Sequence, residues 1–599
     1  MVKNFPALVA AFAFGMLAGA AQAAVSFDAV AAGDMSEHEV VLWTRATDDG
    51  GPTWAVARIA TDPEFKNIVW SGAGSTVPDN DFTLKLHPSG LKSGTVYFYR
   101  FEAGGKSESG RFKTAPAPDR NVPVTFGFSG DADGRFRPYP AIADIGRHRL
   151  DFFVFNGDTM YETASGVAPA ISPRVPNLTP ASTAEDARRA LAAYNLKYRE
   201  NIAGVTETGA MSATGQQSLR ALFAATGHYT LLDNHELGNA SLQSGGAPLA
   251  LTSARNPPAT QAFDANTTGT FHNRTLGFLT LEKSFFNYHP TSVDVQGSPL
   301  SGLTLSGPKV AAPEDPRMHG TARNFFARRW GRQAIYIQTD DRSYRDARLG
   351  SATGGDALAA DPRGANPART MLGSTQLTWL KATLLAAQKS RATWKFVAIS
   401  TPADMIGDVK GVVWQDQKSW YGGYRAERNA LLKFIADNKI DHVVFLTADD
   451  HTTRIGRLQY DTGDGSKALV PGAFHIVAGP IGAGGPDAFA RHDMETIQAA
   501  VTIRTASQAA LGEPMDGLAG LPGLAHVWRE FDPDADTKRQ PVDFLSPDTF
   551  GYTVLSVDRA GTLTVSVFGI PSYPPDKNFV TAPQIPHRVL SFQVRADGR

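Results

Sequence analysis

The sequence predicts a mixed α/β (α+β) protein in which a small N-terminal β-sandwich precedes a larger core of buried strands and helices. Three observations support this fold class. Short alternating strand patterns fill the N-terminal part, a proline-rich segment follows them, and strand patterns then alternate with helical ones. At 599 residues the chain is long enough for roughly two to four folding units.

The N-terminal β-sandwich is predicted over residues 25–116. Runs such as 39–45, 54–58 and 96–101 have strand composition and are separated by Gly, Asp, Pro and Ser turns. The Pro-Ala-Pro segment at 116–118 has the composition of a stiff linker, so we expect the first unit to end there.

The second unit is predicted over residues 120–599. Buried apolar runs followed by helical or loop patterns predict strands at 124–128, 152–155, 229–232, 334–337, 395–399 and 442–446, and again at 552–557, 563–567 and 589–594. This alternation indicates a sheet that carries its functional residues at the carboxyl ends of the strands.

Residues 1–23 have the pattern of a secretory signal peptide. Lys3 precedes an apolar run over 5–20, and Ala-Gln-Ala at 21–23 supplies the small residues that signal peptidase accepts. A membrane anchor is the alternative, but the run is short for a spanning helix and has no basic flank after it. We therefore expect cleavage near Ala23, a periplasmic or secreted protein, and no stable membrane insertion.

Composition argues against several classes of partner and ligand. The 58 Lys and Arg residues nearly balance the 59 Asp and Glu residues, so no overall field favours nucleic acid or an anionic membrane. The chain contains no cysteine, which leaves oxygen and nitrogen donors as the ligands for any metal.

Four of the predicted core strands end in clusters rich in carboxylate, Asn and His side chains. The clusters are at 129–133, 156–162, 233–236 and 447–451. The carboxyl ends of strands converge in an open α/β sheet, so these segments can meet in one crevice. Carboxylates gathered in this way repel one another unless cations neutralise them, which predicts a centre of several metal ions.

Six residues in these clusters are the predicted metal ligands, because they offer hard oxygen or imidazole nitrogen donors: Asp131, Asp158, Tyr161, Asn234, Asp449 and His451. Four neighbours are expected to support the ligands rather than bind metal: Asp133, Asp233, Glu236 and Asp450. A single Asp after a strand is commonly a helix cap or turn former, so the prediction depends on all four clusters together.

These motifs resemble the PhoD family of metallophosphatases. Phe-Asn-Gly-Asp-Thr-Met-Tyr-Glu at 155–162, Asp-Asn-His-Glu at 233–236, Thr-Asp-Asp-Arg-Ser-Tyr-Arg at 339–345 and Ala-Asp-Asp-His at 448–451 follow that family's order. Segments 42–45, 99–101 and 110–116 resemble its fibronectin-like leading domain. The resemblance implies a fibronectin-like β-sandwich, then a four-layer αββα calcineurin-like metallophosphoesterase core that acts on phosphate esters outside the cytoplasm.

Two segments depart from the family pattern. The family's Ser-Cys after its first core strand, where the Cys binds iron, is Ser-Gly-Asp at 129–131, and Asp131 resembles the first aspartate of the wider metallophosphoesterase superfamily. The family's Asp-Asp-His-Glu is Asp-Asn-His-Glu at 233–236, similar to the Gly-Asn-His-Glu of purple acid phosphatases. Both departures favour a binuclear centre, and the expected cofactors are two or more ions of Fe, Ca, Zn or Mn.

The resemblance implies a phosphomonoesterase of the alkaline phosphatase D type. A hydroxide activated by metals that Asp158 bridges would attack phosphorus, so no protein nucleophile is needed. His235 is the predicted general acid, and Arg342 is predicted to bind the phosphate oxygens through its guanidinium. A purely structural pairing of Arg342 with Asp340 or Asp341 is the alternative.

Two other functions stay open at this point. The same metal core cleaves diesters when the pocket admits two substituents, so a phosphodiesterase or a phospholipase D-like hydrolase is one alternative. The second is a non-catalytic exported binding protein with structural metal, although calcium sites rarely use imidazole and His235 and His451 would then have no role. We expect a small-molecule phosphate ester as substrate, and no nucleic acid bound except as a substrate.

Overall fold

The computed structural model describes residues 25–166, 171–204, 219–238, 242–249, 271–292, 315–318, 322–349, 362–404, 421–463, 466–484, 544–546, 549–573, 575 and 586–596. The predicted signal peptide at 1–23 lies outside these residues. Of the helices in the described part of the chain, none is both long enough and apolar enough to cross a membrane.

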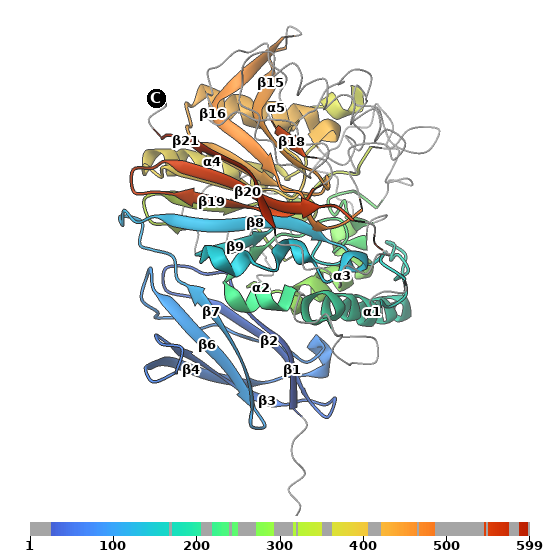
Figure 1. Ribbon diagram of the computed structural model, residues 1–599. Helices are drawn as coiled ribbons and strands as arrows, with labels where there is room; N and C mark the ends of the chain where they lie inside the picture. Colours follow the sequence, from blue (N-terminus) through green and yellow to red (C-terminus); the bar gives the residue numbers. More distant parts are fainter. Residues whose placement is uncertain are drawn as a thin grey trace, which may run out of the picture.

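Two large sheets stack face to face in the core (Figure 1). In pairing order, the first sheet contains β21 (His587–Val594), β20 (Leu563–Pro571), β19 (Thr549–Val557), β8 (Val124–Ala132), β9 (Phe152–Phe155), β10 (His228–Thr230), β1 (Val25–Gly33), β2 (Val41–Asp48) and β5 (Thr83–Leu86), with β17 (Pro480–Gly482) paired to β8. The second contains β11 (Phe326–Trp330), β12 (Ala334–Gln338), β13 (Trp394–Ala398), β14 (Val443–Thr447), β16 (Lys467–Val477), β15 (Thr453–Asp461) and β18 (Phe544–Ser546).

Helices cover the outer face of each sheet. On the first sheet lie α1 (Ala184–Ala203), α2 (Leu219–Ala225) and α3 (Leu276–Tyr288), and on the second lie α4 (Ser374–Lys389) and α5 (Arg425–Asp437). The α1 helix begins at a capping box in which the side chains of Thr183 and Asp186 each accept from the other's backbone N–H. The layers are therefore αββα, and the predicted fold class is confirmed.

Alternate side chains of β9 enter two different cores, which explains why this strand is apolar throughout. Phe152 faces the second sheet, where its ring centroid lies 4.5 Å from that of Trp330. Phe155 faces the helices, with its ring centroid 6.4 Å from that of Phe223 on α2. A parallel strand buried on both faces needs a continuous apolar run, and each strand predicted for the core overlaps one in the structure.

The N-terminal region is a sandwich that shares one layer with the core. Its outer sheet has the order β4 (Ile68–Ser75), β3 (Trp54–Ala60), β6 (Val96–Ala103) and β7 (Lys106–Lys113), and it packs against β1, β2 and β5. Strand β1 pairs in parallel with β10 through Gly33 and His228. A Cβ at Gly33 would lie 2.4 Å from the carbonyl oxygen of Pro290, so only glycine fits this junction. The unit predicted at 25–116 is thus joined to the core by a shared sheet as well as by the linker.

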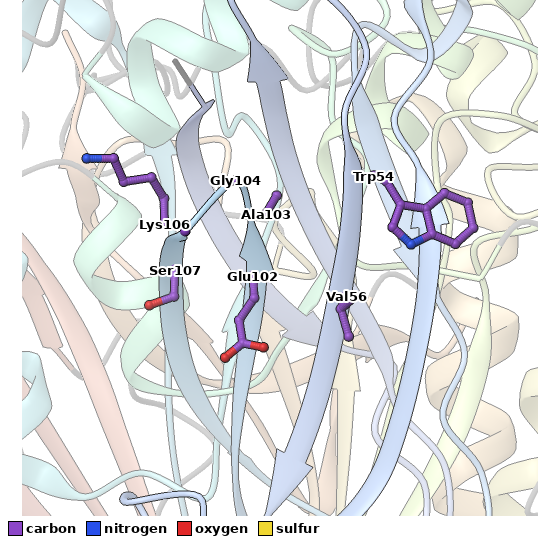
Figure 2. A pocket seen from close by; sticks show the side chains of 8 residues that line it. Trp54, Val56, Glu102, Ala103, Gly104, Lys106 and Ser107 are labelled. Carbon is purple, nitrogen blue, oxygen red and sulfur yellow. The ribbon is translucent and has the colours of Figure 1, made fainter. Parts of the chain in front are cut away.

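An open hollow of about 470 Å³ lies on the N-terminal sheet (Figure 2). Trp54, which is 64% exposed, borders it together with Val56, Glu102, Lys106, Ser107 and the turn at 103–105. With Glu102 as its single carboxylate and no histidine, the hollow lacks the donors of a metal centre.

Candidate metal centre

The four predicted clusters meet at the carboxyl ends of β8, β9, β10 and β14. Donor atoms of Asp131, Asp158 and His451 lie within 4.8 Å of one another, and so do donor atoms of Asp158, Asp233 and Asp449. All five side chains are buried. Asp158 belongs to both groups, so the two clusters share a carboxylate, which is the arrangement that lets two metal ions lie side by side.

The backbone at these ligands is held in an unusual conformation. The φ angle is 61° at Asp131, 52° at Asp158, 65° at Asp449 and 55° at His451. Non-glycine residues rarely adopt positive φ, because Cβ crowds the backbone, and such residues persist where surrounding contacts determine them. Four residues with positive φ in one site indicate that the surrounding fold holds this part of the backbone in a strained conformation, which directs their side chains into the site.

His451 is oriented as a metal ligand. Its Nδ1 lies 2.6 Å from the carbonyl oxygen of Gly484, which can only accept, so Nδ1 carries the proton. The unprotonated Nε2 then faces the first cluster, 3.6 Å from Oδ1 of Asp131 and 2.8 Å from the hydroxyl of Tyr161. A hydrogen bond from the far ring nitrogen is how proteins fix a ligating imidazole, and Tyr161 lies where a second oxygen donor is expected.

The carboxylates of the two clusters fit bound cations. Both side-chain oxygens of Asp131, and Oδ2 of Asp158 and of Asp233, have no hydrogen-bond partner among the described residues. Burial, and then the neighbouring carboxylates, raise the pKa of Asp158 well above its usual range. A bound cation offsets both the burial of these carboxylates and the repulsion between them. Carboxylate, imidazole, phenol and amide donors without thiolate suit hard or borderline metals. We conclude that this donor set fits a centre of metal ions.

His235 lies beside the clusters with one nitrogen turned toward them. Its Nδ1 donates to Oε2 of Glu162 at 2.5 Å, and its Nε2 lies 3.9 Å from Oδ2 of Asp158. The ring of Tyr161 packs on the imidazole at a centroid distance of 3.8 Å. Burial lowers the pKa of His235, but the carboxylates of Glu162, Asp133 and Glu236 together outweigh burial, so the pKa is raised. A protonated Nε2 at this place is suited to donate a proton.

Arg342 lies inside the second cluster. Its Nε donates to Oδ1 of Asp233 at 2.5 Å, and its Nη2 donates to Oδ2 of Asp449 at 2.7 Å and to Oδ1 of Asn234 at 3.3 Å. The side chain is 1% exposed. Asp340 instead accepts from the backbone N–H of Arg342 at 3.1 Å. The guanidinium that the sequence assigned to phosphate is therefore committed to carboxylates of the metal centre.

The residues expected to support the ligands lie around the two clusters. Glu236 accepts from the backbone N–H groups of Asp158, Thr159 and Asp233 at 3.0, 2.6 and 2.9 Å, and so ties two ligand loops together. Asp133 pairs with Arg135. Asp233, expected only to support the ligands, instead contributes a carboxylate oxygen to the second cluster.

The sequence analysis did not identify the residues that hydrogen-bond to the side chains of the site. Glu162, which contacts His235, closes the first motif, and Ser400 follows β13 and donates to Oδ1 of Asp233 at 2.7 Å. The signal for Ser400 was its position after a buried strand, the same signal that marked the ligands.

Comparisons with known proteins relate the chain to phosphatases of one family. The family model described as PhoD-like phosphatase matches residues 126–513, and the model described as PhoD-like phosphatase, N-terminal domain, matches residues 16–116. Alkaline phosphatase D of Bacillus subtilis (strain 168) is 26% identical over 489 residues, which are 78% of this chain and 71% of that protein. A solved structure of PhoD aligns with a TM-score of 0.62 at 20% identity, over 95% of this chain and 90% of the other, and shares its fold.

Proposed function

The chain belongs to the PhoD-like phosphatase family, and we propose that it is an exported phosphomonoesterase that uses two metal ions. It is a hydrolase of phosphoric ester bonds, as the family and the alkaline phosphatase D relative indicate. The preference for monoesters, the number of metals and export from the cytoplasm are the parts that we propose.

The shared carboxylate of Asp158 carries the proposal, because it joins two clusters of buried donors. The first ion would be held by Asp131, Asp158, Tyr161 and His451, and the second by Asp158, Asp233, Asn234 and Asp449. Metal ions in such a site supply a hydroxide nucleophile near neutral pH and neutralise charge on the phosphoryl oxygens.

Two protein side chains complete the reaction around this centre. His235 would give the proton on Nε2 to the leaving oxygen, because its Nδ1 is committed to Glu162. Arg342 would act first as a positioning residue that holds Asp233 and Asp449. Direct contact with phosphate would require the guanidinium to release one of these carboxylates.

Export is supported by the basic residue, apolar run and Ala-Gln-Ala ending of residues 1–23. Mass spectrometry of protein expressed from the full sequence in a bacterium tests it. We expect the N-terminus of the exported fraction to begin near residue 24. An intact Met1 on protein that stays in the cytoplasm would contradict export.

Turnover of p-nitrophenyl phosphate and of its bis(p-nitrophenyl) diester, with Fe, Ca, Zn or Mn added singly and in pairs, tests the activity. We expect faster turnover of the monoester and a loss of about a thousandfold in Asp158→Asn, since the bridging charge is removed while the volume is kept. Asp28→Asn is the matched control, because Asp28 is also buried and pairs with Arg45 away from the clusters. Faster turnover of the diester would make the protein a phosphodiesterase.

A further inference from the structure

A buried ion network lies behind the loop at 449–451. Arg454 on β15 is 0% exposed and makes a two-pronged contact with Asp404, from Nε to Oδ2 at 2.8 Å and from Nη2 to Oδ1 at 2.9 Å. On its other side, Nη1 pairs with Asp450 and donates to Oγ1 of Thr452 at 3.0 Å. One guanidinium thus joins the segment after β13 to the loop after β14.

The network fixes the middle residue of that loop. Asp450 also accepts from Oγ1 of Thr452 at 2.5 Å, so its carboxylate is held by two neighbours. The residues on either side, Asp449 and His451, have positive φ and place their side chains in the two metal clusters. Non-glycine residues with positive φ are strained, so contacts outside the loop have to hold Asp449 and His451 in this conformation.

Asp404 is a charged anchor for the guanidinium. Burial by itself would raise the pKa of Asp404, but Arg454 and then His475, whose Nε2 lies 3.5 Å from Oδ2, keep that pKa well below its usual range. The Arg454 and Asp404 pair is therefore an ionised, bidentate contact, which fixes direction as well as distance. Lysine, a single point charge, could not reproduce it.

We propose that Arg454 is a positioning residue of the metal centre, which holds Asp450 against the Asp404 anchor and thereby aims Asp449 and His451 at the two clusters. The inference rests on the proposed metal centre. Arg454 contacts Asp450 and Thr452, which flank the predicted ligands Asp449 and His451, so its effect on the centre would pass through these ligands. Residues that orient metal ligands typically contribute 10- to 100-fold to metal affinity.

Two quantities are measured. The first is metal affinity, by competition with a chromophoric chelator, and the second is the thermal midpoint of the metal-free protein. The variants are Arg454→Met and Thr452→Val, with Arg329→Met as the matched control. Arg329 is also a buried arginine of this sheet, on β11, where it donates to the carbonyl oxygen of Gly331 at 2.7 Å. We expect affinity to fall about 10- to 100-fold in Arg454→Met and by a smaller factor in Thr452→Val. The control should lower the midpoint without changing the affinity.

Wild-type affinity in Arg454→Met, with a lowered midpoint like that of the control, would overturn the inference. If Arg454→Met does not fold, Thr452→Val decides, because it removes one hydroxyl without changing the charge or shape of the network. Unchanged affinity in that variant would also overturn the inference. A wild-type protein that binds no metal would overturn the proposed function instead.

Discussion

Nδ1 of His235 lies 2.5 Å from Oε2 of Glu162, although the two residues belong to loops that follow different strands. Both side chains are buried, and the carboxylate fixes the proton of the imidazole on the side away from the metal clusters. The other nitrogen, Nε2, therefore faces Asp158, and the ring cannot turn without breaking a charge-assisted bond.

Glu162→Gln should lower kcat selectively for esters with poor leaving groups. The loss of a hydrogen bond to a charged group costs about 1.5–3 kcal/mol, or about 10- to 100-fold in rate, where His235 must protonate the leaving oxygen. p-Nitrophenolate leaves without a proton, so its ester should be affected much less. The measurement is kcat for an alkyl and for a p-nitrophenyl phosphomonoester. Glu200→Gln, a buried carboxylate on α1, is the control, and an equal fall for both esters would mean that Glu162 supports the fold alone.

The core strands could be predicted because their burial leaves a local signal. A strand such as β9, buried on both faces, has to be apolar at every position, and the sequence shows this directly. The junction between β1 and β10 rests on a single residue pair, Gly33 with His228. A single residue pair leaves no periodic pattern in the sequence. The sharing of a sheet between the N-terminal sandwich and the core therefore could not be predicted.

The ligand positions could be predicted because they follow strands, whereas their partners lie across the fold. Asp131 and Asp449 come within a few residues of a strand end, where a polar cluster is conspicuous. The contact of Arg342 with Asp233 joins residues 109 positions apart, and that of Arg454 with Asp404 joins residues 50 apart. The length and composition of a loop do not predict which distant carboxylate an arginine will contact.

Arg342→Met should destabilise the metal-free protein and increase its stabilisation by metal. Removing the guanidinium takes away the cation that Asp233 and Asp449 share, and loss of one partner of a buried ion pair typically costs about 3–5 kcal/mol. A divalent ion then relieves more repulsion than in the wild type. The measurement is the thermal midpoint with and without metal. Arg345→Met is the control, because Arg345 donates to the side-chain oxygen of Gln243 at 2.7 Å. A metal-induced rise no larger than in wild type would show that Arg342 does not neutralise the cluster.

Glu236→Gln should weaken both the fold and the metal centre. Three backbone N–H groups and the hydroxyl of Thr159 donate to this carboxylate, and an amide would turn a donor toward some of them. Each buried donor left without an acceptor costs about 1–3 kcal/mol. Thermal unfolding of the metal-free protein measures the first effect, and metal content after dialysis measures the second. Full metal content in a variant with a lowered thermal midpoint would mean that Glu236 stabilises the fold but does not support metal binding.

Two buried histidines should make the protein sensitive to acid. Burial lowers the pKa of His228 and of His289 to about 3, whereas an unfolded histidine titrates near 6.5. The unfolded chain therefore binds more protons between these values, so this contribution to stability is present above about pH 6.5 and is lost as pH falls toward 3. His228 stacks on Phe223 at a centroid distance of 4.0 Å, and His228→Phe keeps an aromatic ring there without the titration.

The midpoint of His228→Phe minus that of wild type, measured from pH 7.5 to 4.5, checks this pH dependence. We expect the difference to become more positive as pH falls below about 6.5, because the wild type must then charge a buried ring and the variant need not. His38→Phe, at an exposed histidine, is the control. A difference that is constant across this range would mean that His228 accepts a proton in the folded protein as readily as in the unfolded chain.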